Sequence, residues 1–163
     1  VAGPLPVPDP SPRPATVVAL ADLEPRRFER GASRFSHRDA GRAAGSRRTG
    51  LKVMDIDAGA RGFPPHCHSH DEELFVVLSG TGWVVLGDER HALRAGHAVA
   101  RPAGTGVAHS FEAGDTGLQV LAYGTREPGD MAYHPRSGNL EIRGLGVVGR
   151  LQPVDFWDGE EAS

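Results

Sequence analysis

One segment, residues 62–80, constrains the fold more than any other part of the chain. It reads GFPPHCHSHDEELFVVLSG and places three histidines and two glutamates directly ahead of an apolar, β-branched run. His66 and His68 are separated by one residue, so an extended strand directs both imidazoles to the same face. The run that opens at Glu73 and ends at Gly80 is typical of a buried strand. Two imidazoles and a carboxylate that converge make the mixed nitrogen and oxygen site that borderline divalent metals prefer.

The same segment resembles the first motif of the cupin superfamily, in which HxH is followed by a glutamate and then by a glycine. The matching residues are His66, His68, Glu73 and Gly80. The second cupin motif is matched within GHAVARPAGTGVAHSF by Gly96, Pro102, Gly104 and His109. The chain departs from the family at Ala60, where a glycine is usual, and at His97, where aspartate is frequent. His109 also comes two residues later than in the commonest spacing, and no asparagine follows it.

The resemblance implies an all-β fold, the double-stranded β-helix or jelly roll of the cupin barrel. A jelly roll or barrel is also indicated independently of this resemblance, because the chain contains many short strand patterns separated by glycines and no long helical pattern. We expect a single barrel domain over residues 15–163, with a metal-motif core at 51–123 and a C-terminal extension at 124–163. Residues 1–14 contain six prolines and little to bury, so we expect a flexible arm. An arm that lies across a neighbouring subunit is the alternative.

Ahead of the core, residues 16–20 are expected to form an edge strand and residues 21–30 a single helical turn. Within the core, separate strands are expected at 51–58, 73–79, 83–87, 89–93, 97–101, 107–111 and 118–123. The extension is apolar enough to be ordered. Its large apolar residues Phe156 and Trp157 are expected to dock on the barrel or on a partner.

Composition limits the classes of binding partner and the cellular compartment that we expect for this protein. With 163 residues and a formal net charge of -3, neither nucleic acid nor an anionic membrane is expected as the main partner. No apolar run approaches the roughly 20 residues of a membrane span, and the first residues do not resemble a signal peptide. The single cysteine, Cys67, cannot form an internal disulfide and is compatible with a reducing, cytoplasmic location.

Eight arginines lie between residues 26 and 48, with few carboxylates among them. Such a cluster can bind an anionic substrate, for example a phosphate or a sugar nucleotide. It can equally be a solvated face, and the apolar spacing does not show whether these side chains converge. The sequence leaves both interpretations open.

The resemblance implies that His66, His68, Glu73 and His109 bind one divalent transition metal, which could be Fe, Mn, Ni, Zn, Co or Cu. Three imidazoles and one carboxylate leave one or two coordination positions for water or substrate, as in a catalytic site. The alternative is a barrel that keeps these side chains only as a hydrogen-bonded polar cluster.

The remaining candidates receive lesser roles. We expect His70 to be solvated or to support the site, Glu72 to be at the surface, and Cys67 to face away from the two histidines. His91 and His97 are expected to be exposed, and His134 has no assigned role. Three residues are candidates to line a substrate pocket: Met54, Trp83 and Arg101. Arg101 could orient a substrate carboxylate, or could be a surface arginine.

The resemblance implies dioxygenases, decarboxylases, isomerases and sugar epimerases as activities. We expect a metal-dependent enzyme acting on a small organic molecule, first a dioxygenase or related oxidoreductase, and second an isomerase or lyase of sugar type. A non-catalytic protein that binds a small ligand is the third hypothesis. A homodimer is also expected, because barrel edge strands and the apolar residues of the extension need cover.

Overall fold

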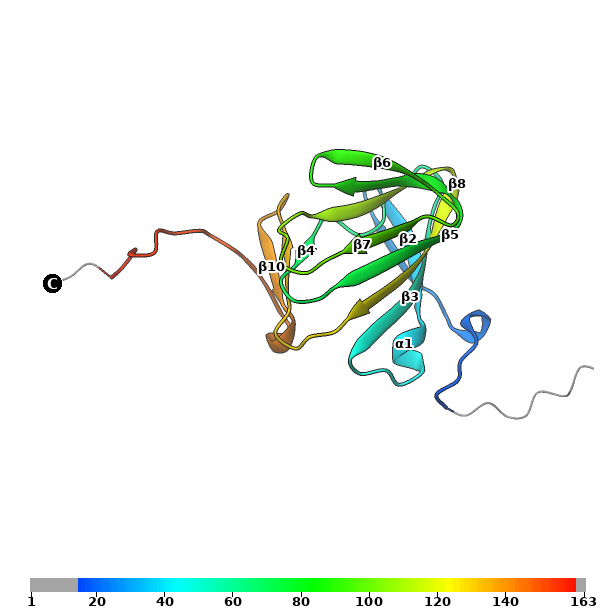
Figure 1. The fold of residues 1–163 in the computed structure, drawn as a ribbon, viewed down its shortest axis with the longest axis horizontal. Helices are drawn as coiled ribbons and strands as arrows, with labels where there is room; N and C mark the ends of the chain where they lie inside the picture. The colour runs from blue at the N-terminus through cyan, green and yellow to red at the C-terminus, as the bar shows by residue number, and fades with distance from the viewer. Residues whose placement is uncertain (1–14, 161–163) are drawn as a thin grey trace, which may run out of the picture.

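The computed structural model describes residues 15–160, which form two antiparallel sheets (Figure 1). The larger sheet contains, in spatial order, β1 (Arg26–Arg30), β2 (Ser33–Asp39), β3 (Thr49–Ile56), β8 (His109–Thr125), β5 (Glu73–Leu86) and β6 (Glu89–Arg94), with β7 (Ala98–Arg101) paired to β5. The smaller sheet contains β11 (Val147–Arg150), β10 (Asn139–Ile142), β9 (Met131–His134) and β4 (Cys67–His68). The prediction of an all-β fold is confirmed.

The long strands β5 and β8 are continuous where the sequence predicted breaks. Their pairing shifts register between Val77 and Ser79 and again between Gly80 and Gly82, which bends the sheet without ending either strand. Gly80 has φ +79°, and a Cβ on it would lie 2.1 Å from the carbonyl oxygen of Gly117. Only glycine fits there, so Gly80 of the first motif marks a bend in one strand and not its end.

The region ahead of the core is where the sequence-based prediction was wrong. Residues 16–20 form no strand. Of the segment 21–30, expected as a single helical turn, only the first two residues are helical, in the short 3-10 helix η1 (Leu20–Asp22), and residues 26–30 are strand β1. β1 and β2 form a hairpin in which the rings of Phe28 and Phe35 stack at 4.8 Å. Cross-strand pairing therefore overrides the weak helical preference of this polar segment. A single helical turn, α1 (Ala40–Ala43), follows β2.

The barrel interior is apolar along rows that cross the paired strands. Val77 of β5 pairs with Val120 of β8, and Val120 pairs with Met54 of β3. All three side chains are buried. The core comprises Phe35, Met54, Ile56, Ala60, Phe75, Val77, Val84, Leu93, Phe111, Ala113, Leu118 and Val120. Burial of this set supplies the main driving force for the fold.

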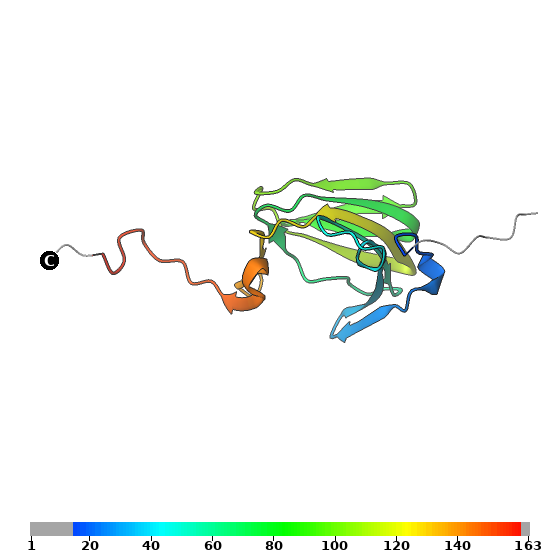
Figure 2. The same ribbon diagram turned by 90° about the horizontal axis from the view of Figure 1, so that it is seen from below.

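The C-terminal extension contributes β9, β10 and β11 to the smaller sheet, which stands at one end of the barrel and is completed by β4 (Figures 1 and 2). β9 pairs with β4 through Cys67 and Tyr133, so the extension contacts the segment that carries the histidines. Residues 151–160 form no strand, and Phe156 and Trp157 are 84% and 68% exposed. The expectation that these two rings dock on the barrel was wrong, and docking on a partner stays a prediction.

Two sequence-based predictions lie partly outside the described residues. The proline-rich arm at residues 1–14 is one, and the domain boundary at residue 15 is the other, so both stay predictions. No helix within residues 15–160 is long and apolar enough to cross a membrane.

Candidate metal centre

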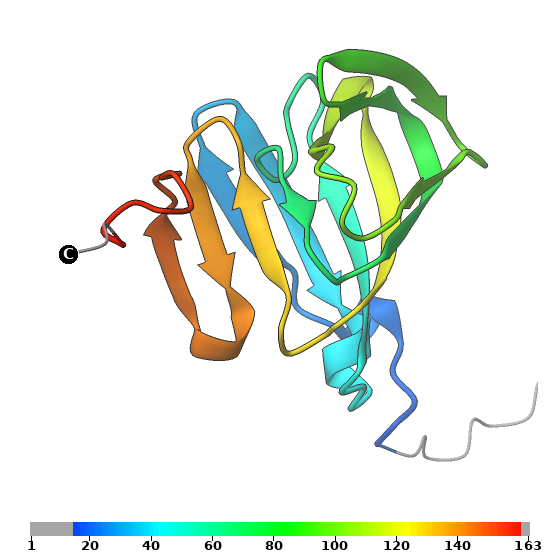
Figure 3. The ribbon, with the colours of Figure 1, turned by 60° about the vertical axis from the view of Figure 1, so that its left-hand side comes forward.

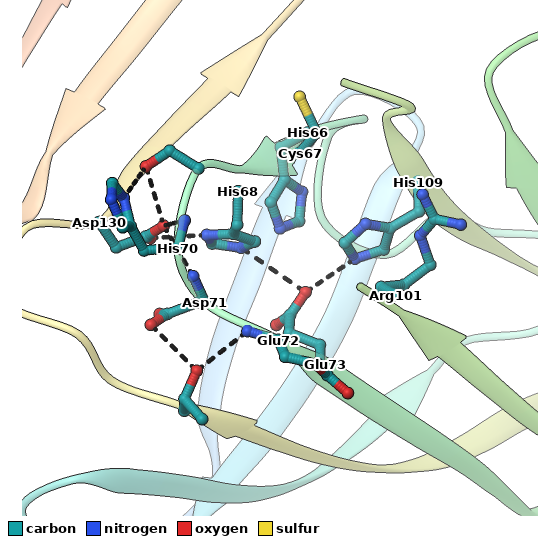
Figure 4. A network of polar contacts seen from close by, with 12 residues as sticks. His66, Cys67, His68, His70, Asp71, Glu72, Glu73, Arg101, His109 and Asp130 are labelled. Carbon is teal, nitrogen blue, oxygen red and sulfur yellow. Dashed lines mark hydrogen bonds and ion pairs between the residues drawn. The ribbon is translucent and has the colours of Figure 1, made fainter. Parts of the chain in front are cut away.

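The structure brings the four predicted ligand residues together (Figure 4). They lie at the end of the barrel where the smaller sheet stands, and Figure 3 shows the backbone of that end. His68 lies on β4, Glu73 opens β5, His109 opens β8, and His66 pairs with His109 through two backbone hydrogen bonds of 3.2 and 2.8 Å. The ring of His66 lies 5.1 Å from that of His68 and 4.6 Å from that of His109, between centroids.

Hydrogen bonds on the outer nitrogens turn two imidazoles toward the centre. The Nδ1 of His66 lies 2.8 Å from the carbonyl oxygen of Pro64, and the Nδ1 of His68 lies 2.7 Å from Asp130 Oδ2. A carbonyl or carboxylate oxygen can only accept, so both Nδ1 atoms carry the hydrogen. In the neutral rings each Nε2 then presents its lone pair, which is the form that a metal requires.

Glu73 provides the carboxylate. Its Oε2 lies 3.1 Å from His109 Nε2 and 3.6 Å from His68 Nε2, and neither approach has hydrogen-bond geometry. Among the described residues this buried oxygen has no donor. Burial raises the pKa of the Glu73 carboxyl, but the close approach of His109 Nε2 and the positive charge that the three histidines carry when protonated lower it below its usual value. An ionised, buried oxygen without a donor is what a cation would satisfy.

The imidazole of His66 is held neutral. Burial is the main cause and the neighbouring His109 acts in the same direction, so the pKa of His66 falls to about 4. One ligand atom from each of His66, His68 and Glu73 lies within 4.8 Å of the others. Because metal ligands must be deprotonated, the lowered pKa values of His66 and Glu73 favour the forms that a metal ion binds.

The cupin domain family matches residues 52–124, the part of the chain that holds this centre. Residues 52–124 are a cupin domain. The cupin fold is also shared with a sugar phosphate isomerase from Silicibacter pomeroyi, at 22% identity and a TM-score of 0.74, with 86% of this chain and 97% of that chain covered.

Two other solved structures have the same fold. A protein from Acidithiobacillus ferrooxidans, assigned as a sugar phosphate isomerase, is 23% identical with a TM-score of 0.72, and the alignment covers 83% of this chain and 90% of that chain. The polyketide cyclase RemF from Streptomyces resistomycificus is 23% identical with a TM-score of 0.58, over 68% and 79% of the two chains. No curated protein sequence matches significantly.

Asp130 holds the His68 ring of this centre through its outer nitrogen, and no sequence pattern indicated this aspartate. Besides His68, its carboxylate accepts hydrogen bonds from the backbone amides of His70 and Asp71, at 3.0 and 3.1 Å, and lies 3.3 Å from Arg143 Nη2. Burial raises the pKa of Asp130, but the amide of His70 and the ring of His68 outweigh it and bring it to about 2. The loop that follows His68 is therefore attached to an aspartate 62 residues away.

Beside the centre lies a cavity of about 280 Å³. Of the three candidate lining residues, only Met54 lines it. Trp83 packs under the guanidinium of Arg90 at 3.8 Å, outside this cavity. Arg101 lines a separate small cavity, and its Nη2 donates to the carbonyl of Val107 at 2.7 Å.

The polar candidates fall largely where the sequence placed them. His70, Glu72 and His91 are exposed, whereas His97 is half-buried and lines none of the cavities described. Cys67 is half-buried, and Figure 4 shows its sulfur directed away from the imidazoles. The sequence missed six polar residues that line the cavity: His37, Lys52, Ser110, His134, Glu141 and Arg143. The alternation of β3 could have indicated Lys52, while Glu141 and Arg143 arrive through the extension.

Proposed function

We propose that this cupin-domain protein binds one divalent transition metal through His66, His68, Glu73 and His109, and is a metal-dependent isomerase or lyase acting on a small polar substrate. One observation carries the proposal. The cavity that the four residues share is also lined by four further groups able to exchange protons: His37, Lys52, His134 and Glu141. A substrate in this cavity would lie between a Lewis-acid site and potential general bases.

The bound metal would polarise a carbonyl or hydroxyl oxygen of the substrate. The residues of the chain would then move a proton. Glu141 is the first candidate for the base, because its carboxylate lines the cavity. His37 is the second candidate, since burial lowers its pKa and a neutral ring can accept a proton. In an aldose–ketose isomerisation the base takes a proton from the carbon beside the carbonyl and returns it to the former carbonyl carbon, while the proton of the neighbouring hydroxyl moves to the former carbonyl oxygen. These proton transfers need no oxidant.

The order of hypotheses therefore changes from that drawn from sequence, which placed a dioxygenase or related oxidoreductase first. The number of titratable groups on the cavity wall favours proton transfer. The two structural neighbours assigned as sugar phosphate isomerases support the same choice, although at 22% and 23% identity they share the fold alone.

The oxidoreductase hypothesis keeps one observation in its favour. Phe63, Phe75 and Phe111 line the same cavity, which suits a flat apolar substrate. Two measurements separate the hypotheses: oxygen consumption with aromatic substrates, and exchange of carbon-bound hydrogen for deuterium in aldose and ketose phosphates.

The test uses untagged protein loaded with zinc, manganese or iron, and follows D-fructose 6-phosphate and related phosphosugars in deuterated water by proton NMR. We expect exchange at the carbon beside the carbonyl, its loss in His109→Ala, and a decrease of at least about 100-fold in Glu141→Gln. Glu89→Gln, at an exposed residue of β6, is the matched control. Metal binding without exchange would leave the non-catalytic ligand-binding hypothesis, and no metal binding would contradict the proposal.

We further propose that the protein is a cytoplasmic homodimer. The exposed apolar residues Leu145, Val147, Val148, Phe156 and Trp157 support a contact with a second copy. The free thiol of Cys67 agrees with a reducing compartment.

A further inference from the structure

A second cavity, of about 650 Å³, adjoins the metal cavity and is rich in cationic side chains. The two cavities share four lining residues, which are His37, Lys52, Glu141 and Arg143. Five cationic side chains, of Arg26, Arg42, Lys52, Arg126 and Arg143, line the second cavity beside three carboxylates, of Glu24, Asp39 and Glu141. One small molecule can therefore extend from the metal centre into this second cavity, which we call the basic cleft.

The cations of the basic cleft differ in whether the protein neutralises them. Arg126 lies 3.1 Å from Asp39, and Arg143 contacts Asp71 and Asp130. In contrast, the Lys52 ammonium and the guanidinium groups of Arg26 and Arg42 form no hydrogen bond or ion pair with any residue in the described range 15–160. Arg26 lies over the ring of Phe28, 4.9 Å from its centroid. The charges of Lys52 and Arg42 have no such contact and are available to a ligand.

Lys52 occupies the junction of the two cavities because of its place in the sheet. It pairs with Asp39 of β2 on one side and with Ala122 of β8 on the other, and Ala122 pairs with Phe75, two residues after Glu73. Ala122 is small and lines the metal cavity, so open space lies beside the lysine. Burial lowers the pKa of Lys52, and Asp39 offsets this in part. A cation kept partly buried without a partner is costly unless an anion joins it.

His37 gives a second, independent sign of a ligand at this junction. Its side chain is only 8% exposed and lines both cavities, and its Nδ1 has no hydrogen-bond partner among the described residues. Buried ring nitrogens are normally paired. Lys52 and His37 thus leave polar groups without partners at the same place, on adjacent strands.

We propose that Lys52, assisted by Arg42 and His37, binds an anionic oxygen group of the substrate, a phosphate or a carboxylate, while the reacting end of the substrate lies at the metal centre. This inference rests on the proposed function and names its substrate class, a small sugar-like acid. It also answers the question left open by the arginine-rich segment. Of its eight arginines, Arg26 and Arg42 line the basic cleft, whereas Arg27 and Arg38 form ion pairs with Asp57 and Asp55.

The test compares three probes, D-fructose 6-phosphate, D-galacturonate and neutral D-fructose, by ligand-observed NMR titration at about 0.15 M ionic strength. The wild-type chain of residues 1–163 and the variants Lys52→Met, Arg42→Met and Arg47→Met are titrated in zinc-loaded and metal-free forms. Arg47→Met is the matched control, because Arg47 is exposed, lines neither cavity and removes the same charge as Arg42→Met.

In wild type we expect at least one acidic sugar to bind at least about tenfold more tightly than fructose, as a charged hydrogen bond requires. Lys52→Met should lose that preference, Arg42→Met should weaken it, and Arg47→Met should keep it. The acid that is preferred identifies the group as phosphate or carboxylate. Equal affinity for all three probes, no measurable binding, or equal losses in Lys52→Met and Arg47→Met would each overturn the proposal.

The two proposals fail separately. If the metal-free protein shows the Lys52-dependent preference but metal loading gives no deuterium exchange, the anion site stands and the isomerase proposal fails. If exchange occurs with neutral and acidic sugars alike and Lys52→Met leaves it unchanged, the isomerase proposal stands and the anion site fails.

Discussion

The Nδ1 of His68 on β4 lies 2.7 Å from Oδ2 of Asp130, which precedes β9. This contact joins the metal motif to the C-terminal extension. Asp130 is 1% exposed and also lies 3.3 Å from Arg143 Nη2, so the extension sets the orientation of the His68 ring. The proposed metal centre therefore depends on residues outside the segment that matches the cupin family.

Replacement of Asp130 by asparagine should lower metal affinity by about 10- to 100-fold, because the amide can donate to Nδ1 and thereby favour the wrong tautomer of His68. Chelator competition with zinc measures the change. Asp88→Asn, in the exposed turn between β5 and β6, removes the same charge and should have no effect. Equal metal affinity in wild type and Asp130→Asn would mean that the contact does not position His68.

The sequence could predict the proposed ligands but not the groups that support them. The HxH spacing and strand parity place His66 and His68 on one face, and a motif match adds Glu73 and His109. Asp130 reaches His68 only in the tertiary structure, through a hydrogen bond. In the same way, Lys52 and Arg143 are distant in sequence but line one cavity. Local periodicity contains no information about which distant strands meet, so the basic cleft could not be inferred.

Gly80→Ala should destabilise the protein by more than about 2 kcal/mol, because it combines a left-handed φ with a clash against the Gly117 backbone. We expect the thermal midpoint to fall by at least about 5 °C. Gly96→Ala is the control, since Gly96 has φ +86° but nothing lies within 4 Å of the added Cβ. If both variants lose the same stability, the close approach at Gly80 contributes nothing beyond φ strain.

The bend at Gly80 also shows where sequence analysis reached its limit for the fold. Glycine punctuation correctly indicated an all-β architecture, but it marked the bulges within β5 and β8 as strand ends. At the amino end, the polar residues of β1 offered no strand pattern, and the strand forms because β2 pairs with it. Pairing partners and not local preference decide such segments.

The metal-free protein should lose stability as the pH falls from about 6.5 to about 4. Burial lowers the pKa of His66 to about 4 and lowers the pKa of His37 and His134, whereas the unfolded chain titrates near 6.5. Between these values the unfolded state binds more protons, so stability decreases with decreasing pH. Thermal midpoints across this range should show the slope, and His66→Gln should reduce it. His91→Gln, at an exposed histidine, should not.

Light scattering at micromolar concentration should return about twice the chain mass of 17.3 kDa. The exposed apolar residues of the extension are the expected contact, so the double substitution Phe156→Ser with Trp157→Ser should weaken the dimer. Val17→Ser, at an exposed apolar residue far from the extension in sequence, is the control. A monomer mass for the wild type would show that these rings stay uncovered.

The metal centre itself is tested by stoichiometry in single variants at fixed pH. His68→Ala and His109→Ala should lose most of the bound metal, because each removes an imidazole whose Nε2 lies within 3.6 Å of the Glu73 carboxylate. His70→Ala should cost much less, since its exposed ring contacts Ser69 and not the centre. Glu73→Gln should lower the affinity for manganese more than the affinity for zinc, because hard cations depend more on carboxylate oxygen. Metal loss in His70→Ala with retention in His68→Ala would contradict the proposed ligand set.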